Sequence, residues 1–124
     1  MTQTAPRPTN PKDLIGTKKS PLELVPSALI IQVAQAMKDG AAKYGAFNWR
    51  GHPVKASVYH AAALRHLLAW ADGEQNAEDS GVHHLAHAAA CFGILLDAEA
   101  TGNLIDDRPA KGPAADLIKS FTVK

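Results

Sequence analysis

The chain has 124 residues, 46% of them hydrophobic and 20% charged, and its formal net charge is +1. This length suits one small domain, and the nearly balanced charge gives no electrostatic reason to expect binding to nucleic acid or to a membrane surface. The single cysteine, Cys91, excludes an intramolecular disulfide, and we interpret it as a small buried hydrophobic side chain.

Targeting and membrane signals are not apparent in the sequence. The opening stretch, MTQTAPRPTNPKD, contains no hydrophobic segment of the kind found in signal peptides. Histidine and glycine interrupt the best apolar run before it reaches the length that spans a bilayer. We therefore expect a soluble, cytoplasmic protein that does not enter a membrane.

Residues 1–26 are rich in proline, which fixes an extended backbone path and excludes helix. We expect residues 1–10 to be disordered. From Asn10 onward the segment gains leucine and isoleucine side chains, so we expect it to lie over the helices. Its lysines are interpreted either as solvated surface or as cations for an anionic ligand, and they are Lys12, Lys18 and Lys19.

The first long helix is predicted to begin at Ser27, which follows Pro26 and is a good N-cap. Apolar side chains recur behind it at spacings of three and four residues, which indicates one buried face. The helix can stop at Gly40 or continue to Gly45 as its C-terminal glycine, and we favour the longer form.

A loop is predicted next, over GAFNWRGHP, because two glycines and a proline punctuate it. Trp49 and Arg50 lie together in this loop and have two interpretations. In one, Trp49 fills the end of the bundle and Arg50 is solvated. In the other, Trp49 stacks on a base and Arg50 contacts a phosphate. Composition alone does not decide between them.

Two further helices are predicted around an acidic loop. The first runs from about Val54 to Asp72 and ends at Gly73, and the second begins near Asp79 or Ser80 and ends before residue 102. Both are dominated by alanine and leucine, which favour helix and leave little polar surface. Such helices must be buried against other helices, and no strand pattern is found.

The predicted fold is therefore all-α, with three main helices and an extended proline-rich N-terminal arm. We expect a single helical domain over residues 11–109 and a tail over 110–124, whose LIKSF segment either forms a small helix or is disordered. Small side chains give one subunit a thin core. A homodimer or higher homo-oligomer that completes a four-helix-bundle-like core is the expected assembly.

Histidines set inside these helices form the strongest candidate site. His84 and His87 are three residues apart on one helix, and His66 lies near the same end of the preceding helix. With Glu74 and Asp79 they fit a divalent metal site for Mn, Zn, Fe or Ni, and the carboxylates alone tolerate Mg. The alternative is that the histidines are hydrogen-bonded core residues.

Other chemistries have less support. Cys91 and His87 are four residues apart, but the apolar surroundings raise the pKa of the thiol rather than lower it, which argues against a catalytic pair. The phosphate-binding pattern GxxxxGK[ST] is not found, and neither is a cysteine-based zinc motif.

Five segments in order carry a resemblance to a known family. They are NPKDLIGTKKSPLELVP, GAAKYGAFNWR, RHLLAWADGE, HHLAHAAACFGILLDA and DDRP. Over about residues 10–109 the chain resembles the bacteriophage dATP/dGTP diphosphohydrolase family, N-terminal domain. That family is commonly placed beside the all-α MazG-like nucleoside triphosphate pyrophosphatases, in which helical ExxE and ExxD motifs hold Mg. The resemblance would place the protein in a host cytoplasm.

The resemblance implies hydrolysis of purine deoxynucleoside triphosphates to monophosphate and pyrophosphate, with a divalent metal such as Mg or Mn. We combine this activity with the residues already singled out. The hypothesis assigns catalysis to His66, Glu74 and Asp79 and the metal to the same three residues plus His84 and His87. It assigns nucleotide binding to Lys43, Tyr44, Asn48, Trp49, Arg50 and Arg65.

This sequence departs from the pyrophosphatase pattern. It lacks ExxE on the second helix, and histidines 84 and 87 stand where ExxD would fall. Histidines do not attract several Mg ions as four carboxylates do. The rival hypothesis is therefore a helical oligomer that binds a nucleotide or nucleotide signal without hydrolysing it, and a third is a structural helical assembly protein.

Overall fold

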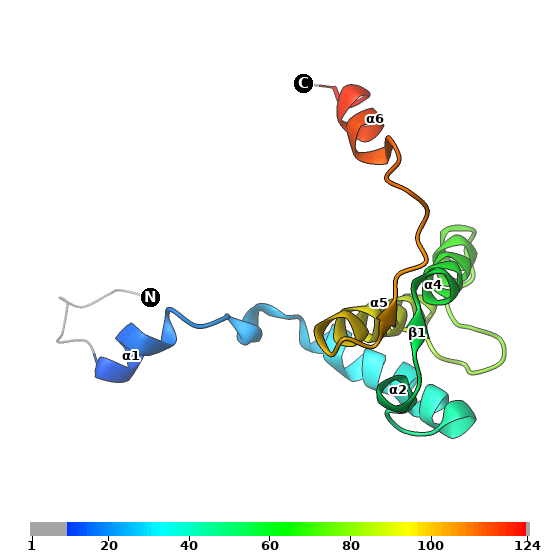
Figure 1. Ribbon diagram of the computed structural model, residues 1–124. Coiled ribbons are helices and arrows are strands. Elements are labelled where there is room, and N and C mark those ends of the chain that lie inside the picture. Colours follow the sequence, from blue (N-terminus) through cyan, green and yellow to red (C-terminus); the bar gives the residue numbers. More distant parts are fainter. Residues whose placement is uncertain (1–9, 124) are drawn as a thin grey trace.

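The computed structural model describes residues 10–123 and shows a bundle of three long helices with shorter elements around it (Figure 1). The long helices are α2 (Ser27–Tyr44), α4 (Ala56–Ala71) and α5 (His84–Ala100). The all-α prediction is confirmed, and each predicted long helix is present. Among the described residues, no helix combines the length and the apolar character needed to cross a membrane.

The short elements lie before, between and after the long helices. They are α1 (Pro11–Gly16), the 3₁₀ helix η1 (Leu22–Leu24), α3 (Asn48–Gly51), β1 (Val54–Lys55), β2 (Leu104–Ile105) and α6 (Ala114–Ser120). The two strands pair in parallel, and this pairing was not predicted because two residues give no periodic signal. Helix α6 confirms the small-helix alternative for the tail.

The ends of the long helices follow the predicted signals only in part. Helix α2 begins at Ser27 and ends before Gly45, whose φ of 92° suits glycine. Helix α4 begins at Ala56 rather than at Val54, because β1 uses the two preceding residues. The predicted helix start near Asp79 or Ser80 was wrong by four residues or more.

Helix α5 begins late because the preceding residues form a turn of their own. The Ala77 amide donates to the Val82 carbonyl (2.8 Å), and the Gly81 amide donates to the Ala77 carbonyl (2.8 Å). His83 then serves as the N-cap, and its Nδ1 accepts from the amide of Leu85 (3.0 Å). A histidine ring thus takes the capping role that the sequence suggested for Asp79 or Ser80.

The core is built almost entirely from alanine. Helix α4 packs against α5, and α5 also packs against α2. The buried hydrophobic residues are Ala36, Val54, Ala56, Ala63, Ala77, Ala86, Ala88, Ala90 and Ala98. Alanine lets helix backbones approach closely but removes little apolar area from water, so the core of one chain is thin.

The N-terminal arm lies away from the bundle, which corrects the prediction that it lies over the helices (Figure 1). Its large apolar side chains are solvent-exposed, including Leu22 at 76% and Leu24 at 74%. The arm also contains helix α1, although proline was expected to exclude helix. Asn10 caps α1 and Pro11 stands at its first position, where the missing amide costs nothing. Of the residues 1–10 predicted to be disordered, 1–9 lie outside the described residues, and Asn10 is ordered as the cap of α1.

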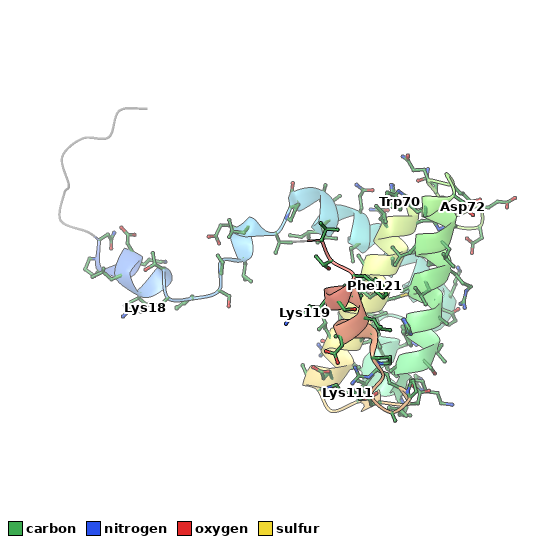
Figure 2. The ribbon with its side chains drawn as sticks, turned by 90° about the horizontal axis from the view of Figure 1, so that it is seen from above. Lys18, Trp70, Asp72, Lys111, Lys119 and Phe121 are labelled. Carbon is green, nitrogen blue, oxygen red and sulfur yellow. The ribbon has the colours of Figure 1, made fainter. Side chains whose placement is uncertain are left out.

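The C-terminal tail also projects from the bundle. Helix α6 stands apart from the long helices in Figure 1, and Figure 2 shows Phe121 at its end. Phe121 is 83% exposed and Ile118 is 71% exposed. Both ends of the chain therefore present apolar side chains to solvent.

A carboxylate on α5 fixes the segment between α2 and α4. Asp97 accepts hydrogen bonds from Trp49 Nε1 (3.1 Å), Arg50 Nε (2.6 Å) and Arg50 Nη2 (2.7 Å). Asn103 adds to this anchor, since its Nδ2 donates to the carbonyls of Trp49 and His52, each at 2.6 Å. The Trp–Arg pair predicted as part of a loop is thus held in α3 by the far end of α5.

The DDRP segment, residues 106–109, contacts the start of α4. Asp107 accepts hydrogen bonds from the amide and the hydroxyl of Ser57, and so satisfies a free amide in the first turn of α4. Arg108 pairs with Asp106 through two contacts of 2.7 Å. These contacts set the entry of α4 beside the end of α5.

Replacing Asp97 by Asn should lower thermal stability, because α3 loses its charge-assisted anchor. The hydrogen bonds from Arg50 lower the pKa of Asp97, so its stabilising effect is present above the unfolded pKa of about 4 and is lost as the pH falls below it. Thermal melts from pH 7 to pH 3 should show the difference between the two proteins shrinking. An Asp116→Asn control on α6 should melt like the parent, and equal melting of Asp97→Asn would contradict the anchor.

Candidate functional site

A cavity of about 260 Å³ opens between α2, α4, α5 and the loop before α5. Its walls contain eight of the residues that the sequence singled out from separate segments. These are Lys43, Tyr44, Asn48, Trp49, Arg65, His66, Asp79 and His87. The packing of the three long helices therefore brings most of the predicted binding and catalytic side chains together.

The cation on α2 lies between two carboxylates at the cavity. Lys43 Nζ is 3.0 Å from Asp39 Oδ2 and 3.3 Å from Asp79 Oδ2. Hydrogen bonds to Asp39 and Asp79 raise the pKa of Lys43, and the bond from Lys43 lowers the pKa of Asp79. This bridge ties the loop before α5 to α2, and it places one positive and two negative charges at the cavity wall.

Arg65 brings a second cation to the cavity from α4. The side chain is exposed, and among the described residues it forms no ion pair. A guanidinium that faces a cavity and is not paired with a carboxylate is available to an anionic ligand.

Three aromatic rings, those of Tyr44, Trp49 and Tyr59, line the cavity. Tyr44 is 71% exposed, whereas Trp49 is partly buried and packs on Phe47 with ring centroids 5.5 Å apart. Tyr59 lies deeper, where burial raises the pKa of its hydroxyl. Burial also raises the pKa of Cys91, which lines the same cavity, so the thiol is not activated for nucleophilic attack.

A chain of hydrogen bonds leads from the cavity to a surface carboxylate. His66 Nδ1 lies 2.8 Å from His84 Nδ1, and His84 Nε2 lies 2.6 Å from Glu74 Oε1. His84 is 5% exposed and is the buried polar residue of the bundle. A buried imidazole costs free energy unless its nitrogens are partnered, and here both of them are.

The third histidine of the cluster, His87, packs its ring against that of His66. The rings of His66 and His87 stack with centroids 4.6 Å apart and an interplanar angle of 12°. His87 Nε2 lies 2.7 Å from Ser80 Oγ, which also accepts from the amide of Val82. Burial lowers the pKa of both His66 and His87.

The five residues predicted to bind a metal do not converge as metal ligands. Over residues 10–123, no group of three or more histidine, cysteine, aspartate or glutamate side chains is placed to hold an ion. The facing nitrogens of His66 and His84, at 2.8 Å, are closer than two ligands of a tetrahedral zinc would stand. Asp79 turns to Lys43 instead. A resident metal therefore does not fit this arrangement, and the metal site stays a prediction.

Three predicted site residues lie outside the cavity wall. Arg50 is held by Asp97 and does not face the cavity, so the structure favours its anchoring role over phosphate contact. His84 and Glu74 lie behind His66 and reach the cavity through it.

Sequence reasoning missed two residues of the cavity, Asp39 and Tyr59. Asp39 lies four residues before Lys43 on a helix, a spacing that brings opposite charges together, so this pair was accessible from the sequence. Tyr59 lies seven residues before His66, a spacing that places both on one side of α4, so its position beside the site was also accessible from the sequence.

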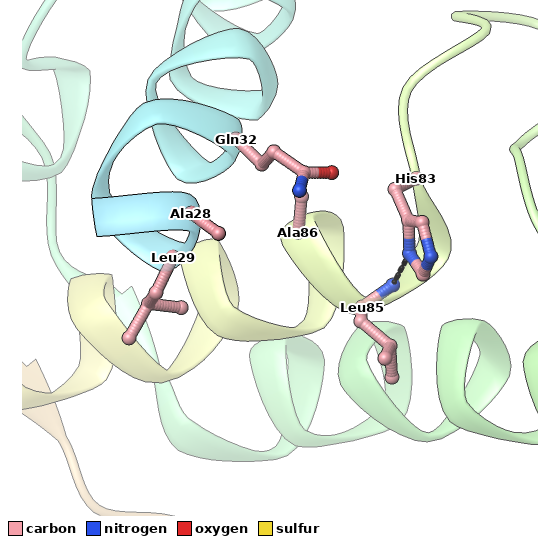
Figure 3. A pocket seen from close by; sticks show the side chains of 6 residues that line it. All are labelled: Ala28, Leu29, Gln32, His83, Leu85 and Ala86. Atoms are coloured by element: carbon pink, nitrogen blue, oxygen red, sulfur yellow. Dashed lines mark hydrogen bonds between the residues drawn. The ribbon is translucent and has the colours of Figure 1, made fainter. Parts of the chain in front are cut away.

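A second cavity, of about 170 Å³, lies between the starts of α2 and α5 (Figure 3). Ala28, Leu29 and Ala86 make its wall mostly apolar. Its histidine, His83, turns its Nδ1 to the amide of Leu85, as Figure 3 shows. The charged and aromatic groups gather instead in the larger cavity, which is the candidate site.

Comparison with known proteins agrees with the family resemblance. A family model described as dATP/dGTP diphosphohydrolase, N-terminal, matches residues 9–108. A protein of Salmonella phage PMBT28 named dATP/dGTP diphosphohydrolase is 33% identical over 72 residues, which is 58% of this chain and 24% of the phage protein. The match thus spans about a quarter of the relative's length. No solved structure matches.

Proposed function

Because the chain belongs to the dATP/dGTP diphosphohydrolase N-terminal family, we propose that it binds a purine deoxynucleoside triphosphate and takes part in its hydrolysis to monophosphate and pyrophosphate. The observation that carries this proposal is the cavity that combines Arg65 and Lys43 with the rings of Tyr44 and Trp49. Deoxynucleoside triphosphates are found in the cytoplasm, so we propose a cytoplasmic location for this activity.

The triphosphate would lie toward the cations. Arg65 offers a planar fork of donors that matches two phosphate oxygens. Lys43 is held by Asp39 and Asp79 at 3.0 and 3.3 Å, and its flexible stem allows the ammonium to move from these carboxylates to a phosphate.

The base would lie against the aromatic rings of Trp49 and Tyr44. Stacking on Trp49 or Tyr44 contributes roughly 1–3 kcal/mol per base and tolerates both adenine and guanine. Asn48 lies at the same wall, and its amide offers both a donor and an acceptor to the edge of a purine.

We propose that the divalent cation enters as part of the substrate, as the Mg or Mn complex of the triphosphate. Mg binds through one or two carboxylates plus substrate phosphates and keeps several waters. Asp39 and Asp79 supply two such carboxylates once Lys43 moves to the phosphates. Asp79 keeps its predicted role as a ligand of the divalent cation, whereas Asp39 takes the place of the predicted histidine ligands.

We also infer that the working form contains a second copy of the chain. Large apolar side chains on and beside α2 are exposed, including Ile30 at 58%, Ile31 at 61% and Phe47 at 63%. Contact with a second copy would remove such side chains from water. An apolar groove beside α2, lined by Ile30, Val33, Met37 and Phe47, is the face we assign to this contact.

Light scattering at micromolar concentration should therefore give the mass of a dimer or a larger assembly. Ile30→Glu places a charge in the groove on α2 and should shift the protein toward monomer, because an unpaired charge is costly at an apolar contact. Val58→Glu, on α4, is the matched control. A stable folded monomer of the parent chain, or dissociation by Val58→Glu alone, would overturn the assignment.

Incubation of the protein with dATP, dGTP and pyrimidine nucleotides, each with Mg or Mn, tests the proposed activity by chromatography of the products. We expect purine monophosphate and pyrophosphate. Arg65→Ala should weaken nucleotide binding at least tenfold, measured by quenching of Trp49 fluorescence in a Trp70→Phe background.

Arg108→Ala is the control for Arg65→Ala, since Arg108 pairs with Asp106 away from the cavity. Unchanged affinity in Arg65→Ala would show that the phosphates bind elsewhere. Binding without any product would support the rival hypothesis of a nucleotide binder, and neither binding nor product would refute the proposed function.

A further inference from the structure

The hydrogen-bonded chain from Glu74 to His66 determines more than the position of the two rings. Its links are His84 Nε2 to Glu74 Oε1 at 2.6 Å and His84 Nδ1 to His66 Nδ1 at 2.8 Å. Because a neutral imidazole has one N–H and one acceptor nitrogen, a hydrogen bond at one nitrogen sets the role of the other.

The carboxylate end fixes the direction of every bond in the chain. Ionised Glu74 only accepts, so His84 Nε2 carries the hydrogen. His84 Nδ1 is then the acceptor, and His66 Nδ1 must carry the hydrogen of the second bond. His66 Nε2 is consequently the nitrogen without a hydrogen, and it holds a free lone pair.

That lone pair lies on the cavity side of the ring. His66 lines the cavity, and its Nδ1 edge is turned to the buried His84, so the Nε2 edge faces away from the helix contact. Among the described residues, Nε2 of His66 has no hydrogen-bond partner. The ring of His87 stacks on that of His66 with centroids 4.6 Å apart, and this contact restricts rotation of the His66 side chain.

We propose that Glu74 and His84 are positioning residues that lock His66 in the tautomer with an unprotonated Nε2, which makes His66 the base for water attack on a bound nucleotide. This inference rests on the proposed function and explains why the cluster is built as hydrogen-bonded pairs rather than as a metal cage. Burial and the neighbouring His87, His84 and Arg65 keep the pKa of His66 below its ordinary value, so the ring is neutral at pH 7.

The proposed step balances without a further reactant. Water attacks the α-phosphorus, a new P–O bond forms, and the bond from the α-phosphorus to the bridging oxygen breaks. Pyrophosphate leaves with the electron pair of that bond, and the proton of the water goes to His66 Nε2. The hydrogen on His66 Nδ1 can then pass to His84 Nδ1, which moves the positive charge next to the Glu74 carboxylate.

The tautomers are directly measurable in the full chain labelled with ¹⁵N histidine. Two-bond correlation spectra should show His66 protonated at Nδ1 and His84 protonated at Nε2. Glu74→Gln should mix these tautomers, because an amide both donates and accepts. Glu78→Gln, in the same loop, is the matched control and should leave the spectrum unchanged.

The same two variants separate positioning from structure in the kinetics. Glu74→Gln should lower kcat about tenfold or more with little change in KM, while the thermal melt stays close to that of Glu78→Gln, because Glu74 is largely exposed. A His66 protonated at Nε2 in the parent protein, or equal spectra and kcat in both variants, would overturn the inference. If no nucleotide is hydrolysed, the proposed function fails while the tautomer spectrum still tests the chain of hydrogen bonds.

Discussion

Close packing of alanine faces between α4 and α5 is the constraint on which the rest of the structure depends. Ala63 and Ala98 are fully buried and Ala88 is nearly so, while Ala86 and Ala90 pack with Ala36 of α2. Because methyl side chains let the two helices approach, His66 of α4 can reach His84 of α5 directly. Larger core residues would separate the helices and with them the two rings. The cavity, the histidine cluster and the anchor of α3 all follow from this contact.

The same constraint explains why the chain leaves so much apolar surface uncovered. Alanine buries little area per residue, so one chain cannot offset the entropy of folding as a core of leucine and phenylalanine would. The exposed Leu22 and Leu24 of the arm, the groove on α2 and Phe121 after α6 are apolar surface without a partner in the described part of the chain. The proposed assembly would complete such a core and leave the polar cavity between α2, α4 and α5 open for the proposed ligand.

The sequence predicted the long helices because alanine and leucine repeat over many residues and glycines end them. It failed where contacts distant in the sequence decide the local structure. Trp49 and Arg50 form a helical turn because Asp97, 47 residues or more away, accepts their hydrogen bonds. Helix α5 starts at His84 because the turn over Ala77 and Val82 closes first. The arm was expected to lie on the bundle because it carries apolar side chains to bury. Those side chains gave no sign of where their partners are.

The sequence predicted which residues form most of the candidate site, but it did not predict how their side chains contact one another. Residue types and helical spacing identified His66, His84 and His87, and cationic side chains suited to phosphate identified Lys43 and Arg65. Spacing cannot show that His84 would use both nitrogens in hydrogen bonds and so lie behind His66. The spacing of Asp39 and Lys43 on one helix could be read from the sequence, but the contact of Lys43 with Asp79 in the loop before α5 could not.

The most direct test of a nucleotide site in this cavity is a titration of the ¹⁵N-labelled chain with the Mg complex of dGTP, followed by NMR. We expect the indole signal of Trp49 and the amides of Lys43, Tyr44 and Arg65 to shift together and saturate with one affinity. Shifts confined to the N-terminal arm or to α6, with these signals unmoved, would contradict the claim that the cavity between α2, α4 and α5 holds the nucleotide.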